Sequence, residues 1–257
     1  MLGLVVAVGA AVRSTWSPCG QSMLSQITPF GERSRNQRFA FTATWFVVGS
    51  ILGGATLGVV AAAGAVATSA ADLSTDGALA IAALLAVACA AVDSGCLGVR
   101  PPFFHRQVNE DWLPRYRGWL YGVGFGWQVG VGVATYIMTA AVVLTVALGA
   151  LSGSALAAFL IAVAFGLVRG LTVFLTARVQ RPAQLQSFHR RFDAWGEPVR
   201  LAVIALQLVV AVVAGVVAWG ATGAVLLGAL VAIVAIATLM SMPRRSRAQD
   251  STARAHT

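Results

Sequence analysis

Long apolar runs alternate with short polar connections along almost the whole chain. A bilayer core about 30 Å thick needs about 20 apolar residues per helix, and seven segments of the sequence meet that need. The last two form one run with an expected turn at 220–223, and the pattern predicts an all-α polytopic membrane protein with a single transmembrane domain, 1–242. The segments lie near 1–29, 39–69, 77–98, 118–150, 154–177, 199–219 and 222–242.

The first segment is interrupted by polar residues at the depth where lipid is expected. Residues 14–29 read STWSPCGQSMLSQITP. Pro18 lacks the amide donor that a continuous helix uses, and backbone groups freed inside a membrane must be satisfied by protein or by water. The stretch therefore predicts a broken helix whose interruption faces other helices or a cavity, an arrangement with which many transporters build a site.

Charge adds an orientation to this picture. Only 11% of the residues are charged, and the net charge of +9 comes from 18 arginines, with no lysine, against nine acids. All of the arginines except Arg13 and Arg169 lie in every second connection, so the positive-inside rule places the N-terminus outside and the C-terminus in the cytoplasm, with the protein in the cytoplasmic membrane. The tail 243–257 is expected to be disordered. The arginine-rich stretches are 30–38, 99–117, 178–200 and the tail.

The same distribution decides the expected partners of the arginines. Positive charge divided among short loops fits contacts with anionic membrane lipid. Nucleic-acid binding is not expected, because it needs the charge gathered on one folded face.

Polar side chains within the spans are the candidate contacts of a cavity, because each is costly in lipid and needs a partner. Asp93 follows Cys89 by four residues and precedes Cys96 by three, which places all three on one helix face. An ion pair between Asp93 and Arg169 would keep both charges in the membrane, and the alternative is that each reaches water near the cytoplasmic side. The candidate cavity residues are Pro18, Gln21, Asp93, Gln128 and Arg169.

The cysteines and histidines indicate no metal or haem site. None of the three cysteines belongs to a CxxC pair and no histidine lies in a predicted span, so ligands for structural zinc or for haem are missing, and no cofactor is expected. Cys89 fits simple packing, whereas Cys19 follows a proline in the interrupted segment and is the candidate nucleophile. The glycine-rich string GWLYGVGFGWQVGVGV fits close helix packing.

A family resemblance rests on the first two segments. An apolar run, Ser17-Pro18-Cys19, a second proline at Pro29, a basic loop and a span containing FVVGSILGGATLG resemble the membrane domain of the cytochrome c biogenesis and disulfide-reductase family. These are the CcdA/DsbD-like thiol–disulfide carriers of the LysE-type transporter superfamily. Members also carry a motif of the type Gly-Trp-Thr-Pro-Cys-Val-Gly-Pro in the fourth span. Here GFGWQVGVGVATYI keeps Gly126 and Trp127 and has Gly130 in place of the cysteine.

The resemblance implies a fold and a function. Spans 1 to 3 and spans 4 to 6 would form an inverted repeat, with broken helices in spans 1 and 4 and one extra C-terminal helix. Electrons would pass from cytoplasmic thioredoxin to an extracytoplasmic thiol protein, in cytochrome c or envelope thiol maturation.

The glycine at position 130 leaves three hypotheses open. In the first, Cys96, or less favourably Cys89, resolves the mixed disulfide formed at Cys19; this requires their Cα atoms to come within about 7 Å. In the second, the protein moves a small solute or ion past the interrupted spans. In the third, it is a membrane scaffold whose partner carries the chemistry.

Overall fold

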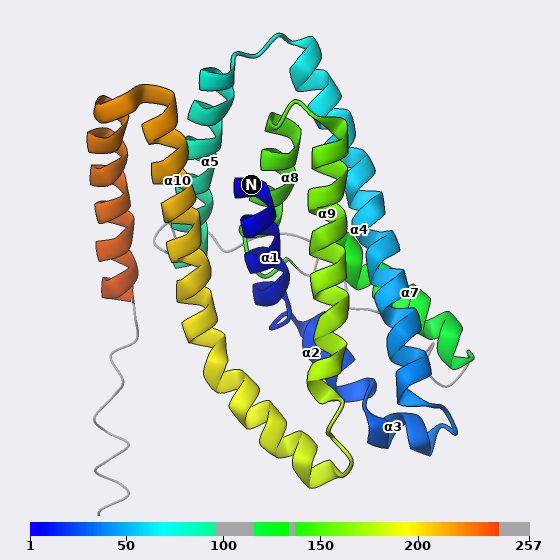
Figure 1. Ribbon diagram of the computed structural model, residues 1–257. Coiled ribbons are helices and arrows are strands. Elements are labelled where there is room, and N and C mark those ends of the chain that lie inside the picture. The colour runs from blue at the N-terminus through cyan, green and yellow to red at the C-terminus, as the bar shows by residue number, and fades with distance from the viewer. Residues whose placement is uncertain (96–115, 134–136, 242–257) are drawn as a thin grey trace, which may run out of the picture.

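A computed structural model describes residues 1–95, 116–133 and 137–241, and the regular structure in these ranges is helical (Figure 1). This confirms the all-α prediction for the described part of the chain. The helices are α1 Leu2–Ser14, α2 Pro18–Gln26, α3 Pro29–Ser34, α4 Phe39–Ala70, α5 Thr75–Ser94, α7 Gly118–Val131, α8 Ala141–Leu151, α9 Ala155–Leu171, the 3₁₀ turn η1 Thr172–Thr176, and α10 Pro182–Ser241.

The number of membrane spans is lower than the sequence predicts. Within the described residues, four helical stretches are long and apolar enough to cross a membrane, and the bent pair α1–α2 makes a fifth candidate. Seven spans are not supported. The predicted fourth span is divided into α7, with 14 residues, and α8, with 11, and at about 1.5 Å per residue neither crosses 30 Å alone. The four stretches are Phe39–Ala70, Thr75–Ser94, Ala155–Thr176 and Pro182–Gly220.

The predicted interruption of the first segment is present between α1 and α2. The two helices are bent by 66°. Ser17 has an extended backbone and its hydroxyl accepts a hydrogen bond from the Gly20 amide at 3.2 Å, while Pro18 takes the first helical position. A serine cap followed by proline is a strong local signal for a helix start. The same pairing, Thr28 and Pro29, begins α3.

Small residues bring α4 into backbone contact with α7 on one side and with α9 on the other. A Cβ atom on Gly126 would overlap the carbonyl oxygen of Phe46, and one on Gly130 would overlap that of Ser50. Gly54 meets α9 in the same way. The glycines therefore act as close-packing positions, as the sequence indicates. Position 130 has no room for a cysteine in this packing.

The long helix α10 is a hairpin of two limbs. Gly220 has φ 62° and ψ −142°, which no helix allows, and Figure 1 shows the chain reversing there. The turn lies where the sequence predicts it. The helix begins at Pro182 and runs through Pro198, so the arginine-rich stretch before the apolar run is helical. α5 packs along α10.

The two ends of the bundle differ in charge. In Figure 1 the α4–α5 turn, the α8–α9 turn and the Gly220 turn lie at one end, and α3 and the start of α10 lie at the other. The three turns contain no arginine, whereas Arg33 lies in α3, Arg35 follows its last residue, and the first part of α10 contains Arg190 and Arg191. The alternation of charge along the sequence is thus a separation of charge along the bundle.

Candidate functional site

Cys19 is the second residue of α2, directly after the helix break. It is 1% exposed and belongs to a cluster of apolar side chains that includes Met23, Phe46 and Tyr121. The Ser17 cap and Pro18 fix the start of α2, so the position of the Cys19 side chain follows from the local signal that breaks the helix.

Arg169 of α9 reaches the same place from the other side of the bundle. Its side chain is buried, with 2% of the residue exposed, and one terminal nitrogen donates a hydrogen bond to the Ser17 hydroxyl at 3.2 Å. The guanidinium lies within electrostatic range of Cys19. Its Nε has no hydrogen-bond acceptor among the residues that the structure describes. Within the described ranges no carboxylate lies within 4.0 Å of it.

Asp93 lies elsewhere, at the break between α7 and α8. Its carboxylate accepts hydrogen bonds from the Thr139 hydroxyl at 2.5 Å, from the Ala140 amide at 2.7 Å and from the Gln207 side-chain amide at 2.8 Å. It therefore caps α8, where a negative charge meets the positive end of the helix dipole. The expected ion pair between Asp93 and Arg169 is wrong, because hydroxyl and amide donors satisfy Asp93 instead.

Two arginines approach the Asp93 cluster from α1 and α10. Arg200 donates a hydrogen bond at 2.9 Å to the backbone carbonyl of Asp93, in the last turn of α5. Arg13 donates to the carbonyl of Gly196 at 3.2 Å. Both line a cavity of about 20 Å³ beside Asp93, which is room for one water molecule. Gln207 is fully buried, and its Oε1 accepts no hydrogen bond from the described part of the chain.

The remaining candidate residues are spread apart. Gln21 is half-buried on α2. Gln128 donates to the carbonyl of Gly124 on its own helix at 3.3 Å, so neither glutamine joins the Asp93 cluster. Cys89 packs in the apolar core of α5, and Cys96 lies outside the described residues. Of the predicted site, Pro18, Cys19 and Arg169 come together. Within the described ranges, no three His, Cys, Asp or Glu side chains lie close enough to hold a metal ion.

A third cluster of polar side chains, centred on Glu32, is not predicted from the sequence. Glu32 is fully buried in α3 and forms an ion pair with Arg35 at 2.6 Å. Its carboxylate also accepts hydrogen bonds from the hydroxyls of Thr42, at 2.5 Å, and Tyr121. Arg35 additionally donates to the carbonyl of Gln26 at 2.6 Å. The cluster ties the end of α2 to α4 and α7. The sequence feature that could have indicated this cluster is the single acidic residue among the arginines of 30–38.

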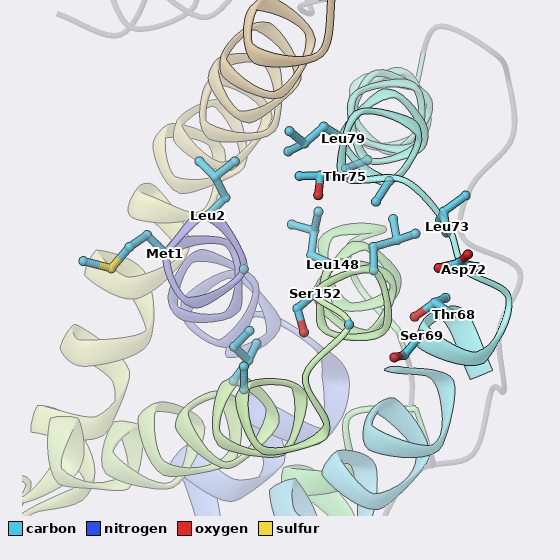
Figure 2. Close-up of a pocket in the computed structure, with 17 residues that line it drawn as sticks. Met1, Leu2, Thr68, Ser69, Asp72, Leu73, Thr75, Leu79, Leu148 and Ser152 are labelled. Atoms are coloured by element: carbon cyan, nitrogen blue, oxygen red, sulfur yellow. The ribbon is translucent and has the colours of Figure 1, made fainter. Parts of the chain in front are cut away.

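A larger cavity opens at the arginine-poor end of the bundle, with a volume of about 520 Å³ (Figure 2). Leu2 of α1, Leu79 of α5 and Leu148 of α8 give it apolar walls, and Asp72 and Ser152 stand at its polar edge. None of the predicted site residues lines it. It is separate from the thiol at the helix break.

These features define a class: a helical membrane protein with two interrupted helices, a buried thiol and arginine at one break, and a partly buried carboxylate at the other. The chain belongs to the family of the methylamine utilization protein MauF. It is 30% identical to the member from Paracoccus versutus over 193 residues, 73% of this chain and 69% of the relative.

Further members of the family give the same result. Identity to the MauF protein of Methylophilus methylotrophus is 28% over 195 residues, 75% of this chain and 68% of the relative. Identity to that of Methylorubrum extorquens is 32% over 164 residues, 62% and 56% of the two chains. No family model matches, so the resemblance to the CcdA/DsbD-like family is not confirmed. No solved structure matches.

Proposed function

We propose that this protein is a membrane component of methylamine utilization that performs thiol–disulfide exchange at Cys19 and so moves reducing equivalents across the cytoplasmic membrane. The observation that carries the proposal is the position of Cys19, buried in the first turn of α2 at a 66° break between two helices. A reactive group at a helix break inside a membrane is held by rigid elements on both sides, and the break supplies unpaired backbone groups around it.

The proposed architecture is an inverted repeat, in which α1–α2, α4 and α5 form one half and α7–α8, α9 and the first limb of α10 form the other. The packing of the helices supports it: α4 lies on α9, α5 on α10, and α1 on α8. Each pair joins corresponding positions in the two proposed halves, with the second limb of α10 as an addition. The arginine-poor turns would face outside and the arginine-rich end the cytoplasm, by the positive-inside rule.

The proposed exchange has two steps. The Cys19 thiolate attacks one sulfur of a disulfide; that S–S bond breaks, a mixed disulfide forms on Cys19, and the other sulfur leaves as a thiolate with the electron pair. A second thiolate of this chain then attacks the Cys19 sulfur, forms a disulfide with it, and releases the bound substrate sulfur as a thiolate with the electron pair. Cys96 is the proposed resolving cysteine, since position 130 has no room for one. A cytoplasmic dithiol protein such as thioredoxin would supply two electrons, and a disulfide on the extracytoplasmic side would receive them.

Growth tests this proposal. In a methylamine-utilizing host that lacks its own family member, the chain is expected to restore growth on methylamine, and the Cys19→Ser variant is expected to fail although it reaches the membrane at normal level. Cys89→Ala is the matched control, because Cys89 only packs in the apolar core of α5. Full growth with Cys19→Ser would overturn the proposal.

A second candidate function, transport of a small solute or ion, is favoured by the Asp93 cluster. Asp93 and Gln207 join α5, α8 and α10 at the second helix break, and the small cavity beside them contacts Arg13 and Arg200. Intramembrane carboxylates of this kind are typical of solute and proton pathways. Loss of growth with Asp93→Asn, with Cys19→Ser silent, would support transport over thiol exchange.

A further inference from the structure

Arg169 is a buried cation with no carboxylate partner among the described residues. Its only described polar partner is the neutral hydroxyl of Ser17, its Nε donates to nothing, and no described carboxylate lies within 4.0 Å. A buried charge is strongly unfavourable unless a partner compensates it. Buried polar groups that lack partners in a folded protein call for an explanation, such as a ligand or a catalytic role. The position of Arg169, at Ser17 and within range of Cys19, points to a negatively charged ligand at the thiol.

Burial limits the size of anything that reacts at Cys19. The residue is 1% exposed and belongs to the buried apolar cluster that includes Met23, Phe46 and Tyr121. A disulfide on the surface of a folded protein would reach this sulfur only after a large rearrangement around α2. A small molecule requires a smaller displacement of the side chains that cover the sulfur.

We propose that the oxidant that exchanges with Cys19 is a low-molecular-mass disulfide bearing a carboxylate, which Arg169 binds. The inference rests on the proposed function and names the substrate class of the same site. A guanidinium recognises carboxylates through planar paired donors, and the unused Nε of Arg169 is available for such a contact. The Ser17 hydroxyl keeps the guanidinium at the start of α2.

The step is balanced for a symmetric disulfide RSSR. The Cys19 thiolate attacks one sulfur, the S–S bond of RSSR breaks, and Cys19–S–S–R forms. The leaving RS⁻ takes the electron pair and a proton from water. Cys19 is oxidised and one RS group is reduced. A dithiol reductant later restores Cys19: one of its thiolates attacks the sulfur of R and releases the Cys19 thiolate, and its second thiol then displaces RS⁻ and closes the reductant's own disulfide.

Charge selectivity tests the inference. The full chain carrying Cys89→Ala and Cys96→Ala, so that Cys19 is the single cysteine, is reacted in detergent with 3,3′-dithiodipropionate, 2-hydroxyethyl disulfide or cystamine, which are anionic, neutral and cationic. Intact-mass spectrometry gives the rate of mixed-disulfide formation. The rates are divided by those of the same chain unfolded in urea and detergent, which removes intrinsic reactivity. The anionic reagent is expected to react faster than cystamine by on the order of tenfold, as for one charge pair partly excluded from water.

Variants assign the preference to Arg169. Arg169→Gln is expected to bring the ratio close to one, and Arg169→Lys to retain part of it, while Arg178→Gln, at an exposed arginine beyond the same helix, should leave it unchanged. If the corrected rates of the anionic and cationic reagents are about equal in the chain that keeps Arg169, the inference is overturned. This outcome does not depend on whether any Arg169 variant folds. A preference that persists in folded Arg169→Gln overturns it as well. In either case Cys19→Ser still decides the proposed function through growth on methylamine.

Discussion

The backbone carbonyl oxygen of Ser50 occupies the space that a Cβ atom on Gly130 would need. α4 and α7 are in direct contact at this point, so the fold admits glycine alone there. The cysteine that the CcdA/DsbD-like resemblance would put at position 130 therefore cannot be restored by a single substitution.

Gly130→Ala tests this contact. Forcing a methyl group into closed packing is expected to lower the free energy of unfolding in mixed micelles by about 1–3 kcal/mol or more. Gly149→Ala is the control, because a Cβ there meets its nearest neighbour at an ordinary 3.4 Å. Equal stability of the two variants would contradict the close packing of α4 on α7.

The buried ion pair of Glu32 and Arg35 is expected to matter more than the exposed pair of Glu197 and Arg200. Both pairs have a separation of 2.6 Å and a spacing of three residues, but the Glu32 side chain is fully buried and that of Glu197 is 53% exposed. Glu32→Ala should destabilise the protein by about 3–5 kcal/mol, since it removes a fully buried partner of Arg35 and also leaves the Thr42 and Tyr121 hydroxyls without their acceptor. Glu197→Ala should change it by less than about 1 kcal/mol. Thermal unfolding of the two variants gives the comparison, and similar shifts would contradict the role assigned to Glu32.

Asp93→Asn replaces an acceptor with a donor in a cluster where every neighbour donates. The amide of Asn would face the Ala140 amide or the Gln207 side chain. A loss of about 1–3 kcal/mol in the free energy of unfolding is expected from the unsatisfied donors. Asp76→Asn, at an exposed position on α5, controls for the change of charge. If both variants unfold alike, the capping of α8 by Asp93 is not significant for stability.

Trp16 holds the first part of α10 against the helix break. Its indole donates to the carbonyl of Phe192 at 2.9 Å and its ring stacks on Phe192 at 4.2 Å. Trp16→Phe keeps a stacked ring and removes the donor, so amide hydrogen exchange over 182–198 is expected to become faster. Trp127→Phe loses a comparable bond, to Thr56, and should leave 182–198 protected. Unchanged exchange in Trp16→Phe would show that this bond does not hold the segment.

Local signals in the sequence predict the breaks in the chain. The cap Ser17 followed by Pro18 is sufficient to end α1 and begin α2, because the proline removes a donor and the serine supplies an acceptor. Gly220 likewise marks the turn of α10, where φ is positive. These features depend on neighbouring residues alone, which is why the sequence reveals them.

Contacts between helices that are far apart in the sequence cannot be predicted from the pattern of neighbouring residues. The sequence left two possibilities for Asp93 and Arg169, an ion pair or separate contact with water, yet the start of α8 offers Asp93 a hydroxyl and an amide donor. Glu32 becomes buried only because α3 folds back onto Thr42 and Tyr121. The helical start of α10 was missed since 182–198 is polar overall. Its signal was the pair Phe188 and Phe192, four residues apart and packed in the same cluster as Cys19.

The central claim is that Cys19 forms a mixed disulfide during methylamine utilization. Its most direct test is to quench cells growing on methylamine in acid, block free thiols, and measure the mass attached to Cys19 in the Cys96→Ser chain, in which the proposed second step is lost. The proposal predicts a mixed disulfide on Cys19 that disappears on reduction and is absent from Cys19→Ser. A Cys19 that is recovered entirely as a free thiol from growing cells would contradict it.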